Sequence, residues 1–195
     1  MRVEIRRLHR RLKATSVFIT HDQIEAMTLA DRLVVMKDGR IEQIGAPAEV
    51  YRAPASLFVA GFIGSPLMNL LPARRIAADV IAFRDGTQLR LSRSAVPIPR
   101  AEELILGFRP EEAIIAEKGP ETLSFAIEMT EEIGTGRLLH GRIAETEAVL
   151  ALPAGARALA QGTPVALRVP ETALHLFDAD TGLRLDNPPL TLAAE

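Results

Sequence analysis

The chain has 195 residues, of which 48% are hydrophobic and 25% are charged, and its formal net charge is −2. This balance is typical of a globular protein and excludes a chain that is disordered throughout. The sequence has no cysteine, which excludes a disulfide scaffold, thiol catalysis and zinc sites with cysteine ligands. No apolar run approaches the roughly 18 residues that cross a bilayer, and the start has no signal-peptide core, so we expect a cytosolic chain.

The first 13 residues are predicted to form a basic helix. Ile5, Leu8 and Leu12 make one apolar stripe, and the other faces carry six basic side chains against one acidic one. We interpret this charge as a solvated face and expect no nucleic-acid partner, because the rest of the chain is net acidic and would repel phosphates. No capping residue or turn precedes the helix, so we expect it to be the middle of a helix that starts further upstream.

A strand and a second helix are predicted next. Residues 16–20 form a short β-branched and aromatic run typical of a buried strand. Asp22 and Glu25 have the spacing of a capping box, so a helix is expected from there to about residue 30. A parallel strand is normally covered on both faces. We therefore expect residues 16–20 to join a small sheet or to be buried against another copy of the chain.

The next segment is predicted to be a hairpin followed by short helices. Asp38-Gly39 separates the apolar runs 32–36 and 41–44, a strong hairpin signal. Residues 48–51 can form a helical turn, and Ser56 can cap a helix that continues to about residue 62.

The sequence changes character near Gly64. Helical periodicity ends, and short apolar runs alternate with turn residues, a pattern typical of a small β-barrel or sandwich. The runs predicted as strands are 80–83, 88–91, 104–108, 123–133, 138–143, 148–152, 165–169 and 174–177.

Several candidate residues have a simpler structural interpretation. The four histidines are scattered without ligand spacing, so we expect no metal site. Arg109 is a candidate interface or effector residue, but its position before Pro110 also fits an ordinary strand end. Gly134-Thr135-Gly136 looks like part of a phosphate loop, but no helix follows it, so a turn is expected.

His21 carries the sharpest functional hypothesis. It lies between the end of a predicted strand and the start of a predicted helix, where ligands gather in α/β sheets and where the helix end favours phosphate. An imidazole there could hold a γ-phosphate oxygen or orient an attacking water. A lone histidine at such a position is nevertheless more often structural.

The segments 17–27 and 30–41 resemble the switch-histidine region of ABC transporter ATPase subunits. Residues 58–66, followed by Met68-Asn69, are similar to the maltose-type group, the ATPase subunits of carbohydrate and glycerol-phosphate importers. Gly107-Phe108-Arg109-Pro110-Glu111 and His175-Leu176-Phe177-Asp178 resemble the C-terminal regulatory domain of that group. The resemblance extends from the first helix to about residue 185.

The resemblance implies an α+β chain with two parts. Residues 1–64 would be the C-terminal part of the ATPase nucleotide-binding domain, a P-loop NTPase α/β domain. Residues 65–195 would be an all-β, OB-like regulatory domain of the TOBE type. The intact family protein would use ATP and Mg²⁺, form a homodimer, bind membrane permease subunits and receive a regulatory protein on the barrel. It would lie at the inner face of the bacterial plasma membrane. His21 would be the switch histidine, and Arg109 and Glu111 would be regulatory or interface residues.

The family's other nucleotide-binding motifs do not occur in this sequence. It contains no Gly-Lys-Ser/Thr phosphate loop, no Leu-Ser-Gly-Gly-Gln signature and no apolar strand that ends in Asp-Glu. Phosphoryl transfer needs several charges around the γ-phosphate at once. We therefore expect a truncated subunit that binds no cofactor and hydrolyses no ATP on its own. The alternative left open is an independent β-barrel regulator that binds a small molecule or a partner.

Overall fold

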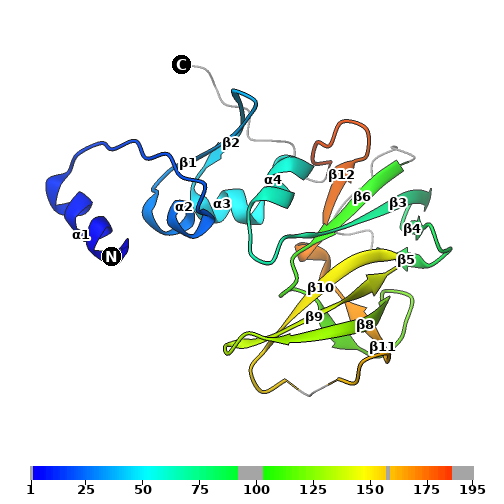
Figure 1. The fold of residues 1–195 in the computed structure, drawn as a ribbon. Helices are drawn as coiled ribbons and strands as arrows, with labels where there is room; N and C mark the ends of the chain where they lie inside the picture. Colours follow the sequence, from blue (N-terminus) through cyan, green and yellow to red (C-terminus); the bar gives the residue numbers. More distant parts are fainter. Residues whose placement is uncertain (1, 92–102, 157–158, 186–195) are drawn as a thin grey trace. The chain divides into compact units, whose positions relative to one another are not determined.

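The computed structural model describes residues 2–91, 103–156 and 159–185. It divides the chain into two compact units, Met1–Ser65 and Pro66–Glu195. The first unit combines helices with a β-hairpin and the second is built from strands (Figure 1). The α+β prediction with a β-rich second part is confirmed.

The described residues of unit 1 form four helices and one hairpin. The elements in chain order are α1 (Arg2–Leu12), α2 (Gln23–Leu29), β1 (Leu33–Lys37), β2 (Arg40–Gly45), α3 (Pro47–Arg52) and α4 (Leu57–Phe62). β1 and β2 pair antiparallel around the predicted turn, where Asp38 and Gly39 both have positive φ, 48° and 78°. This is the combination that a tight hairpin turn requires, and Asp-Gly supplies it at low cost.

The core of unit 1 is small. Its buried hydrophobic cluster consists of Val35, Val50, Val59 and Ile63, contributed by β1, α3 and the α4 region. Ser56 caps α4 by accepting a hydrogen bond from the Val59 amide at 3.4 Å. The predicted hairpin and helical segments therefore pack on one another around a few aliphatic side chains.

The prediction of a buried strand at residues 16–20 was wrong. These residues form no strand, and Val17, Phe18 and Ile19 are 90%, 69% and 94% exposed. Within the described part of unit 1, β1 and β2 form a sheet of two strands that pair only with each other. An apolar run in a β-favourable sequence stays exposed when no neighbouring strand or helix covers it.

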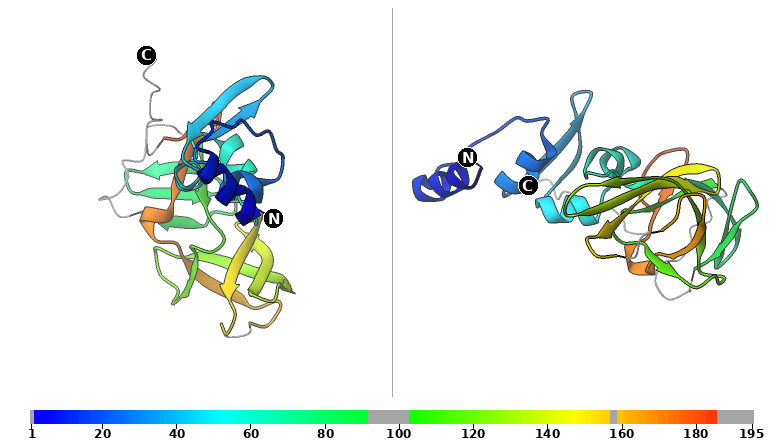
Figure 2. Two further views of the ribbon diagram at one scale, coloured as in Figure 1. Left: turned by 90° about the vertical axis from the view of Figure 1, so that its left-hand side faces the viewer. Right: turned by 60° about the horizontal axis from the view of Figure 1, so that its bottom comes forward.

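The described residues of unit 2 form two five-stranded antiparallel sheets. One has the strand order β10-β9-β8-β11-β7 and the other the order β12-β6-β3-β4-β5. Its strands, together with the short 3₁₀ helix η1, are β3 (Asn69–Ala77), β4 (Val80–Phe83), β5 (Gln88–Arg90), β6 (Glu103–Phe108), β7 (Ile114–Ala116), β8 (Leu123–Glu132), β9 (Gly136–Ile143), β10 (Thr146–Pro153), β11 (Pro164–Arg168), η1 (Glu171–Ala173) and β12 (His175–Asp178). The strands curve around a common interior (Figure 2), and one continuous cluster of buried apolar residues joins the two sheets.

A buried asparagine closes the gap between the two sheets. The Asn69 side chain on β3 donates from Nδ2 to the Val149 carbonyl and accepts at Oδ1 from the Val149 amide, both at 2.8 Å. Nearby, the Ala151 amide donates to the Pro110 carbonyl at 3.0 Å. The outward-facing backbone groups of Val149 and the amide of Ala151 on β10 therefore have hydrogen-bond partners, as they would beside another strand. These bonds protect a sheet edge that would otherwise be open.

Two strands were missed by the sequence pattern, β3 and β7. β3 contains Pro72, and proline argues against a central strand because it cannot donate a ladder hydrogen bond. The register explains why proline is tolerated. β4 pairs with β3 only from Ala73 onward, so Pro72 is paired with β6 on one side and has no partner in β4 on the other. β7 has only three residues, which is too short for a periodic signal.

Candidate functional site

His21 lies in unit 1 at the turn that leads into α2, and its side chain is exposed. Hydrogen bonds around it fix the turn. Thr20 Oγ1 accepts from the Asp22 amide at 3.0 Å and donates to Glu25 Oε2 at 2.9 Å. Gln23 Oε1 accepts from the Gly64 amide at 2.7 Å, which ties the start of α2 to the end of the unit.

The predicted capping box is only half formed. Asp22 caps α2 by accepting hydrogen bonds at Oδ1 from the amides of Ile24 and Glu25, at 2.8 and 3.2 Å. Glu25 does not return the bond to the Asp22 amide, because its carboxylate is held by Thr20 instead. Threonine two residues before the cap competes for the same partner, a local alternative that the spacing of Asp22 and Glu25 does not reveal.

Unit 1 as it stands does not fit a magnesium nucleotide. The first amides of α2 are the groups that would bind a phosphate. Those of Ile24 and Glu25 already donate hydrogen bonds to the Asp22 carboxylate. That carboxylate also places a negative charge where a phosphate would bind. His21 is therefore a single exposed imidazole beside an occupied helix end, which is too few groups to hold a triphosphate.

Arg109 and Glu111 lie in unit 2, directly after β6. Arg109 is 1% exposed and is one of the largest fully buried side chains in the described residues, whereas Glu111 is exposed. The Arg109 carbonyl accepts from the Glu112 amide at 3.1 Å and forms a tight turn. Of the two candidates, Glu111 is the one presented at the surface.

The buried Arg109 and the neighbouring Glu111 both influence the pKa of Glu112. Burial, reinforced by the adjacent Glu111 carboxylate, raises the pKa of Glu112 above its usual range. Arg109 opposes this shift through a backbone hydrogen bond and through its positive charge. The turn after β6 is thus a charged cluster in which burial outweighs the attraction of the arginine.

Two motifs that are distant in the sequence meet at the pairing of β6 with β12. Gly107 on β6 lies opposite His175 on β12, and a Cβ at Gly107 would lie 2.8 Å from Met68 Sδ and 3.0 Å from the Phe177 ring. Glycine is therefore required there by close packing. His175 is also buried, so this junction is part of the core of unit 2.

The turn after β12 is organised by Asp178. Its Oδ1 accepts from the Thr181 amide at 2.7 Å, from Thr181 Oγ1 at 2.8 Å and from the Asp180 amide at 3.1 Å. These bonds, those from Thr181 first, hold the pKa of the Asp178 carboxyl below its usual range. Gly182 completes the turn with a φ of 70°.

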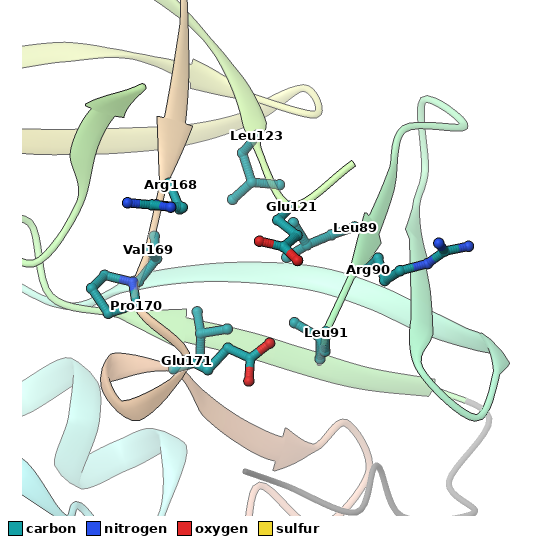
Figure 3. A pocket seen from close by; sticks show the side chains of 10 residues that line it. Leu89, Arg90, Leu91, Glu121, Leu123, Arg168, Val169, Pro170 and Glu171 are labelled. Atoms are coloured by element: carbon teal, nitrogen blue, oxygen red, sulfur yellow. The ribbon is translucent and has the colours of Figure 1, made fainter. Parts of the chain in front are cut away.

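A cavity of about 260 Å³ opens in unit 2 between β5, the start of β8 and the segment from β11 to η1 (Figure 3). Five aliphatic side chains and four charged ones are among the residues that line it. No sequence pattern predicts this cavity, because its residues come from three separate parts of the chain and follow no motif.

The described residues contain neither a candidate metal site nor a candidate membrane-spanning helix. None of the acidic and histidine side chains in the described part of the chain group closely enough to hold a metal ion. None of the helices in that part is long and apolar enough to cross a bilayer.

Comparison with known proteins gives matches in both units. Residues 64–113 match the family model described as the MalK OB fold domain. The chain is 42% identical over 99% of its length to an sn-glycerol-3-phosphate import ATP-binding protein UgpC of Rhizobium johnstonii, and 47% identical over 95% to that of Cereibacter sphaeroides. It spans 52% and 51% of those two proteins, so it covers about half the length of the curated relatives it matches.

A more distant match is found among solved structures. The molybdate-bound form of the cytoplasmic molybdate-binding protein ModG superposes with a TM-score of 0.43 at 13% identity, covering 55% of this chain and 94% of that one. This similarity is too low to carry an argument about fold or ligand.

The strand architecture of unit 2 and the matched model together define a protein with an OB-fold domain of the MalK type. By sequence, almost the whole chain is similar to ATP-binding subunits of sn-glycerol-3-phosphate importers, of which it spans about half. The resemblance noted from the motifs is thereby confirmed.

Proposed function

We propose that this chain is part of the ATP-binding subunit of an ABC importer for sn-glycerol-3-phosphate or a related sugar or polyol. The observation that carries the proposal is the identity of 42% to 47% with UgpC proteins over 95% to 99% of the chain. In the intact subunit, ATP hydrolysis would drive uptake through membrane permease subunits. Residues 1–64 would be the C-terminal part of the nucleotide-binding domain and residues 65–195 the regulatory domain.

The exposed apolar segment of unit 1 supports this assignment. Val17, Phe18 and Ile19 form a run suited to a buried strand, yet the described residues leave them uncovered. A nucleotide-binding domain with its remaining strands present would cover them. His21 is separated from this run by Thr20 alone, so it would then lie at the strand end and contact the γ-phosphate. ATP and Mg²⁺ would be held mainly by residues that this chain does not contain.

The partners follow from the same assignment. Two subunits would form a homodimer, permease subunits would dock on the nucleotide-binding domain, and a regulatory protein would contact unit 2 near the exposed Glu111 and the buried Arg109 beneath it. The subunit would lie in the cytoplasm, peripheral to the inner face of the bacterial plasma membrane. This chain alone would bind neither ATP nor Mg²⁺ productively.

A chimeric subunit tests the proposal. The chain replaces the matching stretch of the Cereibacter sphaeroides UgpC protein, and glycerol-3-phosphate uptake is measured in cells that lack their own subunit. We expect uptake to be restored, and to be lost again with His21→Ala. The matched control is His140→Ala, a histidine of β9 that hydrogen-bonds Glu131 at 3.1 Å and has no proposed role in nucleotide contact.

The amount of chimera at the membrane is measured by immunoblot. A chimera that assembles with the permease but restores no uptake contradicts the proposed function. Equal uptake with and without His21→Ala contradicts the role assigned to that histidine.

A further inference from the structure

The cavity of unit 2 has a rigid apolar floor. Leu89, Leu91, Leu123, Val169 and Leu174 line it, and all five are buried members of the large hydrophobic cluster of unit 2. Their positions are therefore fixed by packing on the rest of the core, which is the condition for a preformed binding site.

The mouth of the cavity carries charges of both signs. Glu121, Glu171, Arg90 and Arg168 line it. In Figure 3 the two carboxylates lie between the leucine side chains, whereas the two guanidinium groups extend outward on opposite sides. The groups presented to the space above the apolar floor are thus the acidic ones.

The charge of Arg90 is engaged outside the cavity. Its Nε lies 3.7 Å from Asp79 Oδ2, and Asp79 is not among the residues that line the cavity. The backbone reinforces this arrangement, because the Leu91 amide donates to the Asp79 carbonyl at 2.8 Å. Arg90 is therefore paired with a carboxylate outside the cavity.

We propose that this cavity binds a small aliphatic ammonium compound. The alkyl chain would lie on the leucine floor and the ammonium group would lie between the carboxylates of Glu121 and Glu171. A cavity of about 260 Å³ lies below the range of roughly 300–1,000 Å³ of drug-sized sites, which restricts the ligand to a short chain. The proposal concerns unit 2 by itself and goes beyond the transport function. The ligand-binding test is therefore independent of the proposed transport function.

A titration of the complete chain tests the proposal. Pentylammonium is the probe, and pentanoate and pentan-1-ol at matched ionic strength are the comparison ligands with the same chain and a negative or neutral end. Binding is followed by the backbone amide NMR shifts of Leu89, Leu91 and Leu174. We expect saturable shifts with pentylammonium, affinity at least about 10-fold lower for the alcohol, and no saturation with the carboxylate, because charge complementarity sets the preference.

Variants locate the charge. Glu121→Gln combined with Glu171→Gln is expected to lower the affinity for pentylammonium at least about 10-fold and to leave that for pentan-1-ol within twofold. Glu117→Gln, an exposed glutamate outside this cavity, is the matched control and should leave both unchanged. Preserved dispersion of the amide spectrum shows that each variant is folded.

Three results would overturn the proposal. The first is the absence of saturation with pentylammonium at any soluble concentration. The second is equal affinity for the amine and the alcohol. The third is preferential binding of pentanoate, which would assign the site to Arg168 instead.

Discussion

The two units of this chain differ in how completely they bury their own apolar side chains. Unit 2 collects its aliphatic and aromatic side chains into one cluster that spans both sheets. Unit 1 buries only Val35, Val50, Val59 and Ile63 as a cluster and leaves Val17, Phe18 and Ile19 in solvent. Burial of apolar area is the main favourable contribution to folding, so we expect unit 2 to supply most of the stability of the chain and unit 1 to depend on further contacts.

The largest expected effect comes from a matched pair of phenylalanines. Phe125→Ala removes a ring that is 0% exposed in unit 2 and should lower the free energy of unfolding by about 3–5 kcal/mol. Phe18→Ala removes a ring that is 69% exposed in unit 1 and should change it by less than about 0.5 kcal/mol. Urea unfolding followed by far-UV circular dichroism measures both. Similar losses at the two positions would show that residues 16–20 are buried in solution.

A smaller loss is expected when the closure between the sheets is removed. Asn69→Ala deletes both hydrogen bonds to Val149 and leaves partly buried backbone groups unsatisfied, at a cost of about 1–3 kcal/mol. The same urea experiment measures it. Gln88→Ala, at an exposed position of β5, is the control and should be nearly neutral. An Asn69→Ala variant as stable as the control would contradict the role given to this side chain.

The next effect is confined to unit 1. Asp22→Ala removes the cap of α2 and should destabilise that helix by about 1 kcal/mol, which is visible as faster hydrogen exchange at the amides of Ile24 and Glu25. Asp31→Ala, at an exposed position after the helix, should leave their exchange unchanged. Exchange in unit 2 should be unaffected by either substitution, and a change there would contradict the separation of the two units.

The smallest expected effect is a pH dependence. The pKa of Glu112 is raised in the folded protein by burial and by Glu111, so the unfolded chain loses this proton at lower pH than the folded one. The stability that Glu112 contributes is therefore complete below the unfolded pKa of about 4.3 and is lost as pH rises through the higher folded pKa. Relative to Glu112→Gln, the wild-type chain should become less stable in urea titrations as pH rises above about 4.3. A difference that grows in the opposite direction would show that the Arg109 attraction dominates.

The sequence predicted the elements whose signals are local. The Asp38-Gly39 hairpin, the Asp22 and Ser56 caps and most strands of unit 2 each depend on residues close together in the chain, and they are present. The failures depend on distant neighbours. Residues 16–20 lack partners that a strand needs, and β3 is a strand despite Pro72 because β4 pairs only beyond that residue.

The candidate site divides in the same way. His21, Arg109 and Glu111 are candidates because they lie in motifs. The burial of Arg109 and the exposure of His21 follow from packing that the motifs do not encode. The cavity had no sequence signal at all, since Leu89, Glu121 and Glu171 are brought together only by the fold.

We propose that this chain is part of an importer ATP-binding subunit and that it does not hold the nucleotide by itself. Equilibrium dialysis of the complete chain against labelled ATP with Mg²⁺ tests it most directly. We expect no saturable binding up to millimolar ATP and the same result for His21→Ala. Stoichiometric binding at micromolar ATP would contradict the account.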